Sequence, residues 1–411
     1  MKKFLIFALI LAVAGGAFAQ SLNTSGFFRT GLSYRFNDSD DAQGGLQFAH
    51  IDDFSHRAQL GIVIRNADGN AEAHFNFRIN DGGAAVDGSS LRVHFLENTL
   101  RIAAGNGALP WDVNTQGGIG EGFGIRGNGG FHVSYLPISD LILHFSLQNL
   151  PNRVADVALP GRLLENLNYA GGLRYTLSGV GSFNLYAQYN GNRGGSATDH
   201  NWDGNYGRIS LAVGANLDPI VSDIPMVTGV GIDVAVYDLT QVRTVLQNPL
   251  LAYNFQTNPR VKMNAMDIGI GQRLGFNFNG ITLGLNLRQG LRLNDGGDMD
   301  FAFRVTADLA YPIPDTRFTP RLSVAYRLGN HGVQQGGNPA YRRADQIGWN
   351  NDVYDGLSAF ALNPRVDINL TPGMAFELGY TFHMNMGEAL LEANRVASTF
   401  HSVYMNIGLT F

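Results

Sequence analysis

The sequence predicts an all-β protein, a transmembrane antiparallel up-and-down β-barrel of about 16–18 strands. Three observations lead to this fold class. Apolar and polar side chains alternate along most of the chain after residue 19, the connections between alternating segments are short and long by turns, and the alternation continues to a final Phe411. Period-two alternation marks a β-strand with one apolar and one polar face.

Residues 1–19 have the pattern of a signal peptide. Lys2 and Lys3 are followed by an apolar run that ends at Val13, and the small-x-small sequence ending at Ala19 is a cleavage site. The apolar run is too short for a permanent membrane anchor. We therefore expect an exported protein whose first segment is removed.

The composition does not suit a soluble enzyme. Charged residues make up only 15 % of the chain and aromatic residues 11 %, with 52 glycines, whereas soluble domains are about 25 % charged. After the signal peptide no apolar run reaches the roughly 20 residues that a spanning helix needs. Only helices and closed barrels satisfy their backbone hydrogen bonds in lipid, so we expect 20–411 to form a single barrel domain.

The clearest strand is 70–80, where Ala71, Ala73, Phe75, Phe77 and Ile79 alternate with polar residues. The same pattern predicts about eighteen strands in all. Their ranges are 26–36, 56–65, 70–80, 90–96, 99–105, 131–136, 141–150, 167–177, 182–190, 206–217, 226–238, 261–278, 281–293, 299–311, 316–328, 357–370, 373–385 and 399–411.

The connections alternate in length. Tight turns are expected at 66–69, 178–181, 279–280, 312–315 and 371–372, and long loops at 37–55, 106–130, 239–260 and 329–356. Bacterial outer-membrane barrels have short periplasmic turns and long extracellular loops. The connection 294–298 is the one outer loop expected to be short. Asn279-Gly280 is the strongest turn signal, because a two-residue type I′ hairpin needs positive φ at both positions.

Arginine decides which face meets water. An arginine at the bilayer midplane costs roughly 2–4 kcal/mol, and total protein stability is only about 5–15 kcal/mol, so a face with many arginines must line water. The arginines expected to line the pore are Arg29, Arg57, Arg78, Arg92, Arg273, Arg288, Arg292, Arg304, Arg317, Arg321 and Arg365, with Arg35, Arg65, Arg101, Arg174, Arg208 and Arg327 on the same faces.

Fewer acids lie on these polar faces, so the inner wall is expected to be basic. They are Glu72, Asp233, Asp267, Asp300, Asp308, Asp367 and Glu377. A basic lumen concentrates anions and predicts a mild anion preference. Inward arginines can equally pair with inward acids and brace the barrel, and the sequence leaves both interpretations open.

The last strand ends in an aromatic residue. In 403–411, Val403, Met405 and Phe411 alternate with polar or small residues. This resembles the terminal strand by which outer-membrane proteins are recognised for insertion, which implies that Phe411 is an assembly signal read by the outer-membrane assembly machinery. Ile407 and Leu409 depart from the aromatic residues that such proteins often have there.

Residues 20–411 resemble the bacterial porins, by architecture rather than by a diagnostic motif. The resemblance implies an outer-membrane location, passive diffusion of small hydrophilic solutes, contact with outer-membrane lipids and lipopolysaccharide, and a homotrimer as a hypothesis. The third outer loop of a general porin folds inward. Here the third outer loop is 106–130, with the charged residues Asp112, Glu121 and Arg126. The resemblance implies that these three residues form a constriction in the pore. An ordinary surface loop fits the sequence equally well.

Two other functions remain open: a substrate-specific channel for anionic solutes, and a surface-exposed adhesin on a barrel scaffold. An enzyme is not expected. His144 and Ser146 share one strand face, but no third catalytic partner can be named from spacing. The chain has no cysteine, the sequence predicts no metal site or cofactor, and its scattered basic residues do not suggest nucleic-acid binding.

Overall fold

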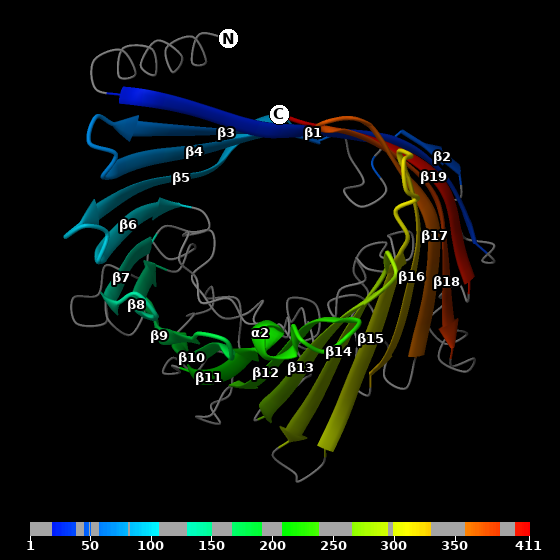
Figure 1. Ribbon diagram of the computed structural model, residues 1–411. Coiled ribbons are helices and arrows are strands. Elements are labelled where there is room, and N and C mark those ends of the chain that lie inside the picture. The colour runs from blue at the N-terminus through cyan, green and yellow to red at the C-terminus, as the bar shows by residue number, and fades with distance from the viewer. Residues whose placement is uncertain are drawn as a thin grey trace, which may run out of the picture.

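The computed structural model is a single antiparallel sheet that closes on itself around a central space (Figure 1). It describes residues 19–37, 45–48, 50, 57–80, 83–106, 130–149, 167–190, 208–237, 265–294, 299–329, 358–386 and 399–411. Nineteen strands belong to the sheet within these ranges, and β2 is a three-residue piece beside β1. The other eighteen form the barrel wall. The predicted fold class is confirmed, with the larger of the two expected strand numbers.

The strands follow one another around the wall in chain order. Their bounds are β1 Ala19–Asn37, β2 Gly45–Gln47, β3 Arg57–Asn66, β4 Ala71–Asn80, β5 Gly83–Phe95, β6 Leu100–Asn106, β7 Gly130–Ile138, β8 Leu141–Asn149, β9 Leu167–Leu177, β10 Gly181–Asn190, β11 Arg208–Asn216, β12 Val227–Tyr237, β13 Ala265–Phe278, β14 Ile281–Asn294, β15 Met299–Ala310, β16 Phe318–Gly329, β17 Ser358–Thr371, β18 Met374–Met386 and β19 Thr399–Thr410. A short helix, α2 (Asp218–Val221), lies between β11 and β12.

The first and last strands close the barrel. The first part of β1 pairs with β3, and its second part, from Phe27 onward, pairs with β19. The backbone amide of Phe411 donates to the carbonyl of Gly26 at 3.0 Å, and the amide of Gly26 donates to the carbonyl of Phe411 at 2.8 Å. Every strand of this ring therefore pairs with a neighbouring strand on each of its two edges, as a membrane-spanning sheet requires.

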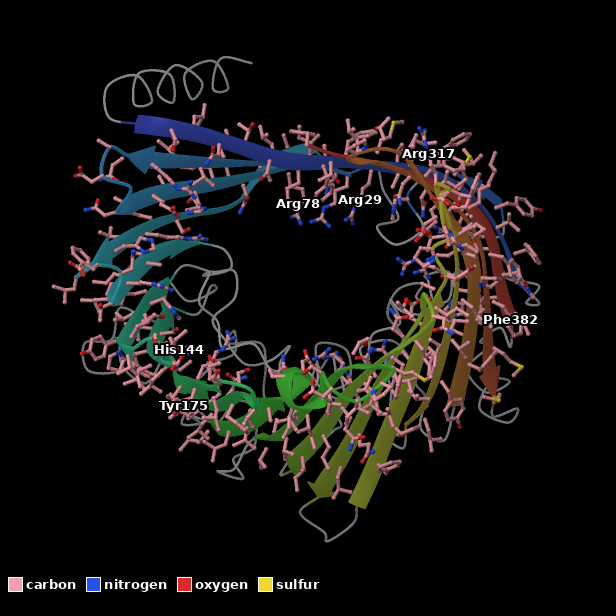
Figure 2. The ribbon with its side chains drawn as sticks, in the orientation of Figure 1. Arg29, Arg78, His144, Tyr175, Arg317 and Phe382 are labelled. Carbon is pink, nitrogen blue, oxygen red and sulfur yellow. The ribbon has the colours of Figure 1, made fainter. Side chains whose placement is uncertain are left out.

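Side chains alternate between the two sides of the wall, with the apolar set outside. In β19, Val403 and Met405 are 55 % and 39 % exposed, whereas Ser402 and Tyr404, which alternate with them, are at most 2 % exposed. Figure 2 shows Arg29 and Arg78 pointing into the central space, and Tyr175 and Phe382 on the outer side. This is the inverse of a soluble protein, and it confirms the predicted register of the two faces. The described residues include no helix long and apolar enough to cross a membrane.

The tight turns lie mainly at one end of the barrel. Asn279 and Gly280 have φ of +51° and +91°, so the type I′ turn predicted from this dipeptide is confirmed. By the rule that periplasmic turns are short, the end with this turn is the periplasmic end. The connection 217–226 at the same end is longer and includes α2.

The sequence was wrong about β5 and the connection before it. The strand was expected at 90–96 but begins at Gly83, and Asn80 of β4 pairs directly with Gly83. The connection 81–82 is therefore a second short outer loop besides 295–298. The pairing shifts register between Asn76 and Phe77, and such a β-bulge breaks the alternation on which the prediction relied.

The turn at Gly280 offers a test of the fold. Gly280→Val places a β-branched residue at φ +91°, which we expect to lower the free energy of unfolding by about 1–3 kcal/mol. Urea unfolding of the refolded barrel in detergent measures the change. Gly284→Ala is the control, because a Cβ there meets no atom within 4 Å, and we expect an effect within about 0.5 kcal/mol. Equal stability of the two variants contradicts the turn assignment.

Candidate functional site: the inner wall of the barrel

The inner wall is built by every second residue of each strand, so its side chains come from all parts of the chain. Three strand neighbours at the start of the wall bring arginines together. Arg29 of β1 lies directly opposite Arg57 of β3, and Arg78 of β4 lies opposite Gln59. The guanidinium carbons of Arg29 and Arg57 are 4.5 Å and 5.7 Å from the ring centroid of Phe27. An inward aromatic ring thus supports two of these cations.

A second group of arginines lies on β14, β15 and β16. Arg288 is directly opposite Arg304, and Arg304 is directly opposite Arg327. The Arg304 side chain is only 8 % exposed. Arg292 of β14 is placed by the backbone between Asp267 and Asp300. Like charges directly opposite each other destabilise a sheet. The repulsion within this row of arginines must therefore be reduced by water in the interior or by nearby carboxylates.

Towards the periplasmic end, two arginines share two carboxylates. Arg321 of β16 contacts Asp367 through Nε at 2.6 Å and Asp308 through Nη1 at 3.3 Å. Arg365 of β17, directly opposite Arg321, lies 3.6 Å from each of the same two carboxylates. The two cations and two anions form one network that braces β15, β16 and β17.

The network continues sideways through neutral groups. The Ser323 hydroxyl donates to Asp308, and Arg365 donates to Ser323 at 2.7 Å and to Asn363 at 3.1 Å. The Asn363 amide in turn donates to the Tyr404 hydroxyl at 3.1 Å. Hydrogen bonds therefore run along the inner wall from β15 to β19.

The space for Tyr404 comes from a glycine on β18. A Cβ at Gly379 would stand 2.3 Å from the Tyr404 ring and hydroxyl, so no larger residue fits without moving the ring. Tyr404 itself is 2 % exposed. The pairing of a large inward ring with a facing glycine fills the wall without adding charge.

A smaller ionic group braces β3, β4 and β5. Arg65 contacts Glu72 at 2.6 Å, and His74 contacts the other oxygen of Glu72 at 2.8 Å. Arg92 is directly opposite Glu72 in the register. Here one acid is shared among several basic side chains, as in the network at β15–β17.

Two predicted arginines lie near the periplasmic turns. Nη2 of Arg273 donates to both carboxylate oxygens of Asp218, at 2.8 Å and 2.9 Å, and Asp218 also accepts a hydrogen bond from the Val230 backbone amide at 2.7 Å. Asp218 was missed by the sequence reasoning because it begins the short helix α2 between β11 and β12, outside any alternating segment. Arg317 precedes β16 by one residue, is exposed, and donates to the carbonyl of Leu370 at 2.7 Å.

The inner face of β7, β8 and β10 is polar and uncharged where histidines and serines meet. His132 contacts the hydroxyls of Ser146 and Ser134, at 2.5 Å and 3.1 Å. The His144 ring is 5.3 Å from the His132 ring and 5.5 Å from the Tyr186 ring, between centroids. The sequence had singled out His144 and Ser146, but the histidine that bonds Ser146 is His132.

The three charged residues of the expected constriction, Asp112, Glu121 and Arg126, lie outside the described residues. Phe411 is described, and its side chain is 59 % exposed at the end of β19. Within the described ranges, no group of three or more histidine, aspartate or glutamate side chains is placed to hold a metal ion.

Comparison with known proteins identifies the fold. No protein-family model matches the sequence, and no curated relative does. Solved structures match over nearly the whole chain. The outer membrane protein OpdK from Pseudomonas aeruginosa aligns with a TM-score of 0.53 at 9 % identity, covering 96 % of this chain and 100 % of its own.

Two further solved structures match with similar scores. OccAB4 from Acinetobacter baumannii has a TM-score of 0.52 at 10 % identity, covering 96 % of this chain and 98 % of its own. OprD from Pseudomonas aeruginosa has a TM-score of 0.50 at 11 % identity, with 96 % coverage of both chains. The fold is therefore that of a porin-type outer-membrane β-barrel. Together with the apolar outer face, this fold confirms the predicted location in the bacterial outer membrane.

The network at β15–β17 gives a test of bracing. Asp308→Asn keeps the side-chain shape but removes the charge that Arg321 and Arg365 share. We expect the free energy of unfolding to fall by about 1–2 kcal/mol, measured by urea titration. In the double variant with Arg321→Gln the two losses are expected not to add, because the residues share one network. The control Asp68→Asn lies in an exposed turn, and a loss as large there contradicts the bracing role.

Proposed function

We propose that the protein is a channel of the outer membrane through which small hydrophilic solutes diffuse passively, with a mild preference for anions. The proposal is a channel rather than an enzyme. One observation carries it: the arginine-bearing faces of the strands are turned to the inside, as Arg29 and Arg78 illustrate (Figure 2). So large a number of guanidinium groups is tolerated beside water but not beside acyl chains.

The anion preference follows from how the inward charges are arranged. In three places the register sets arginine against arginine: Arg29 faces Arg57, Arg304 lies between Arg288 and Arg327, and Arg321 faces Arg365. The third pair shares two carboxylates, which neutralise it. Arginines outnumber acids on the inward faces of the strands, and this excess supports a preference for anions. Neutralisation of part of the arginines by carboxylates makes the expected preference mild, since a uniformly basic pore would give a strong one.

The loop 106–130 belongs to the proposal as a constriction. In this view Asp112, Glu121 and Arg126 narrow the pore, and the two acids face wall arginines across it. The partner proposals rest on the same resemblance to porins: contact with lipopolysaccharide and outer-membrane lipids, assembly by the outer-membrane machinery, and a homotrimer. Light scattering of the purified protein tests the trimer directly.

The charge of the wall can be tested by electrical recording. We expect Arg29→Glu with Arg78→Glu to lower the anion-to-cation permeability ratio by about two- to fivefold, read as a shift of the reversal potential across a planar bilayer in a salt gradient. Arg29→Lys with Arg78→Lys keeps both charges and is the matched control. An unchanged reversal potential in the glutamate variant contradicts the proposed selectivity.

The same recordings separate the candidate functions. Large, steady conductance steps with little dependence on solute support the diffusion channel. Block by one anionic solute at low concentration supports the substrate-specific channel that the sequence left open. Absence of conductance from correctly folded protein contradicts any channel and favours the adhesin.

The assembly signal is tested separately from conduction. Deletion of Phe411 removes the residue whose backbone bonds twice to Gly26 at the closing seam. We expect the yield of heat-modifiable, folded barrel in outer-membrane fractions to fall several-fold, while Phe411→Tyr retains the wild-type yield. A deletion that assembles as well as wild type contradicts the role of Phe411.

A further inference from the structure

A histidine stands among aromatic rings on the outer face of the barrel. His401 of β19 lies directly opposite Phe36 of β1 and Phe382 of β18. Tyr34 lies on β1 with Phe36, and Tyr380 lies on β18 with Phe382. We call His401 and these four aromatic residues the His401 cluster. Polar side chains are rare on the lipid-facing side of a barrel, so a histidine there needs a physical explanation.

The orientation of the cluster is set by its sequence neighbours. Ser33 and Arg35, on either side of Tyr34, are 1 % and 2 % exposed, whereas Tyr34 and Phe36 are 53 % and 39 % exposed. Ser402, next to His401, is fully buried on the inner side. Figure 2 shows Phe382 on the outer side of the wall. The His401 cluster therefore faces the membrane.

The rings hold the imidazole in one orientation. The Phe36 ring stacks on His401 with centroids 4.7 Å apart and an interplanar angle of 3°, and the Phe382 ring lies 5.2 Å away at 45°. The Tyr380 hydroxyl is 2.6 Å from Nδ1 of His401. The Phe36 ring covers a face of the imidazole, and the tyrosine occupies one of its two nitrogens.

The tyrosine contact decides what the other nitrogen does. A phenol is a better hydrogen-bond donor than a neutral imidazole, so Tyr380 donates and Nδ1 accepts. Neutral imidazole has one protonated nitrogen, which places the remaining hydrogen on Nε2. Among the described residues Nε2 has no hydrogen-bond partner. A donor left unsatisfied in hydrocarbon is costly, so Nε2 requires an acceptor from beyond the described residues.

The height of the cluster indicates which acceptors are within reach. On β18, Phe382 is eight residues above Met374, where the periplasmic turn ends. At about 3.3 Å per residue and a tilt of roughly 40°, this is about 20 Å. The apolar band of such barrels is about 25 Å tall, so His401 lies in its outermost part, close to the level of the extracellular headgroups.

We propose that the His401 cluster is a lipid site, in which Nε2–H of His401 donates a hydrogen bond to the phosphate of a membrane lipid in the extracellular leaflet. Phosphate is the strong acceptor at this level of a membrane. Aromatic rings are suited to the boundary between headgroups and acyl chains, and Tyr34 and Phe36 provide them on one side of the imidazole. The site is independent of whether the barrel conducts.

Native mass spectrometry of the purified protein in dodecyl maltoside tests the proposal. The probe is dimyristoyl phosphatidic acid, and dimyristoyl glycerol is the matched lipid without phosphate. We expect the wild-type protein to retain about tenfold more of the phosphatidic acid, and His401→Phe, which keeps an aromatic ring, to retain the two lipids equally. Tyr380→Phe loses the hydroxyl that orients the imidazole, and its retention of phosphatidic acid is expected to lie between those of the wild type and His401→Phe.

His383→Phe is the control variant, because His383 lies on β18, the strand beside His401, but faces inward and is 7 % exposed. It should retain phosphatidic acid as the wild type does. Equal retention of both lipids by the wild type, or undiminished retention by His401→Phe, overturns the proposal. So does a dimer that His401→Phe abolishes, because the occupant would then be a second copy of the chain.

A second measurement does not depend on any variant folding. In protein labelled with nitrogen-15 at histidine, the Nε2 resonance of His401 should shift on addition of phosphatidic acid and stay in place on addition of dimyristoyl glycerol. A resonance that responds to neither lipid, or equally to both, contradicts phosphate recognition.

Discussion

The closed ring of backbone hydrogen bonds is the constraint on which the rest of this structure depends. In hydrocarbon no water is available to a strand edge, so a spanning sheet must pair its first strand with its last. Here β1 does so with β19, and the backbone of Phe411 bonds to Gly26 at the seam. Once the ring is closed, each strand has one side towards lipid and one towards the interior, and the alternation of residue types is obligatory.

The inner face shows two ways of keeping arginine in a wall. Arg321, Arg365, Arg65 and Arg273 each contact carboxylates, which fixes neighbouring strands to one another and reduces the local charge. Arg29 and Arg57 lie over the ring of Phe27, which is a second kind of contact for inward arginines. Of the two interpretations that the sequence left open, bracing is therefore seen at these carboxylate contacts, and the anion preference stays a prediction for electrical recording.

The fold was readable from the sequence because its main determinant is local. Alternation over about ten residues places a strand and assigns its faces at once, so strands such as 167–177 were predicted to the residue. The same reasoning failed at β5, where a bulge interrupts the alternation. A strict period-two pattern assigns successive residues to opposite faces, so it does not predict where a bulge inserts an extra residue.

The contacts within the wall were less predictable, because they depend on the register between strands. Nothing in the sequence around Asp218 shows that it meets Arg273, which is far along the chain. His132 replaces His144 as the partner of Ser146 for the same reason: the bond crosses between two strands whose offset is set by the whole ring. The outward histidine at position 401 likewise gains its meaning only from Phe36 and Tyr380 on neighbouring strands.

Labelling of single cysteines tests the inside-out arrangement most directly, and the chain has no cysteine of its own. Cysteines would be placed at Arg29 and Arg78 and at their strand neighbours Phe28 and Phe77, and the barrels refolded into lipid vesicles. A membrane-impermeant, water-soluble thiol reagent should react with the first two positions and leave the second two unmodified. Reaction at Phe28 and Phe77, with protection at Arg29 and Arg78, would show that the arginine-bearing faces do not line an aqueous interior.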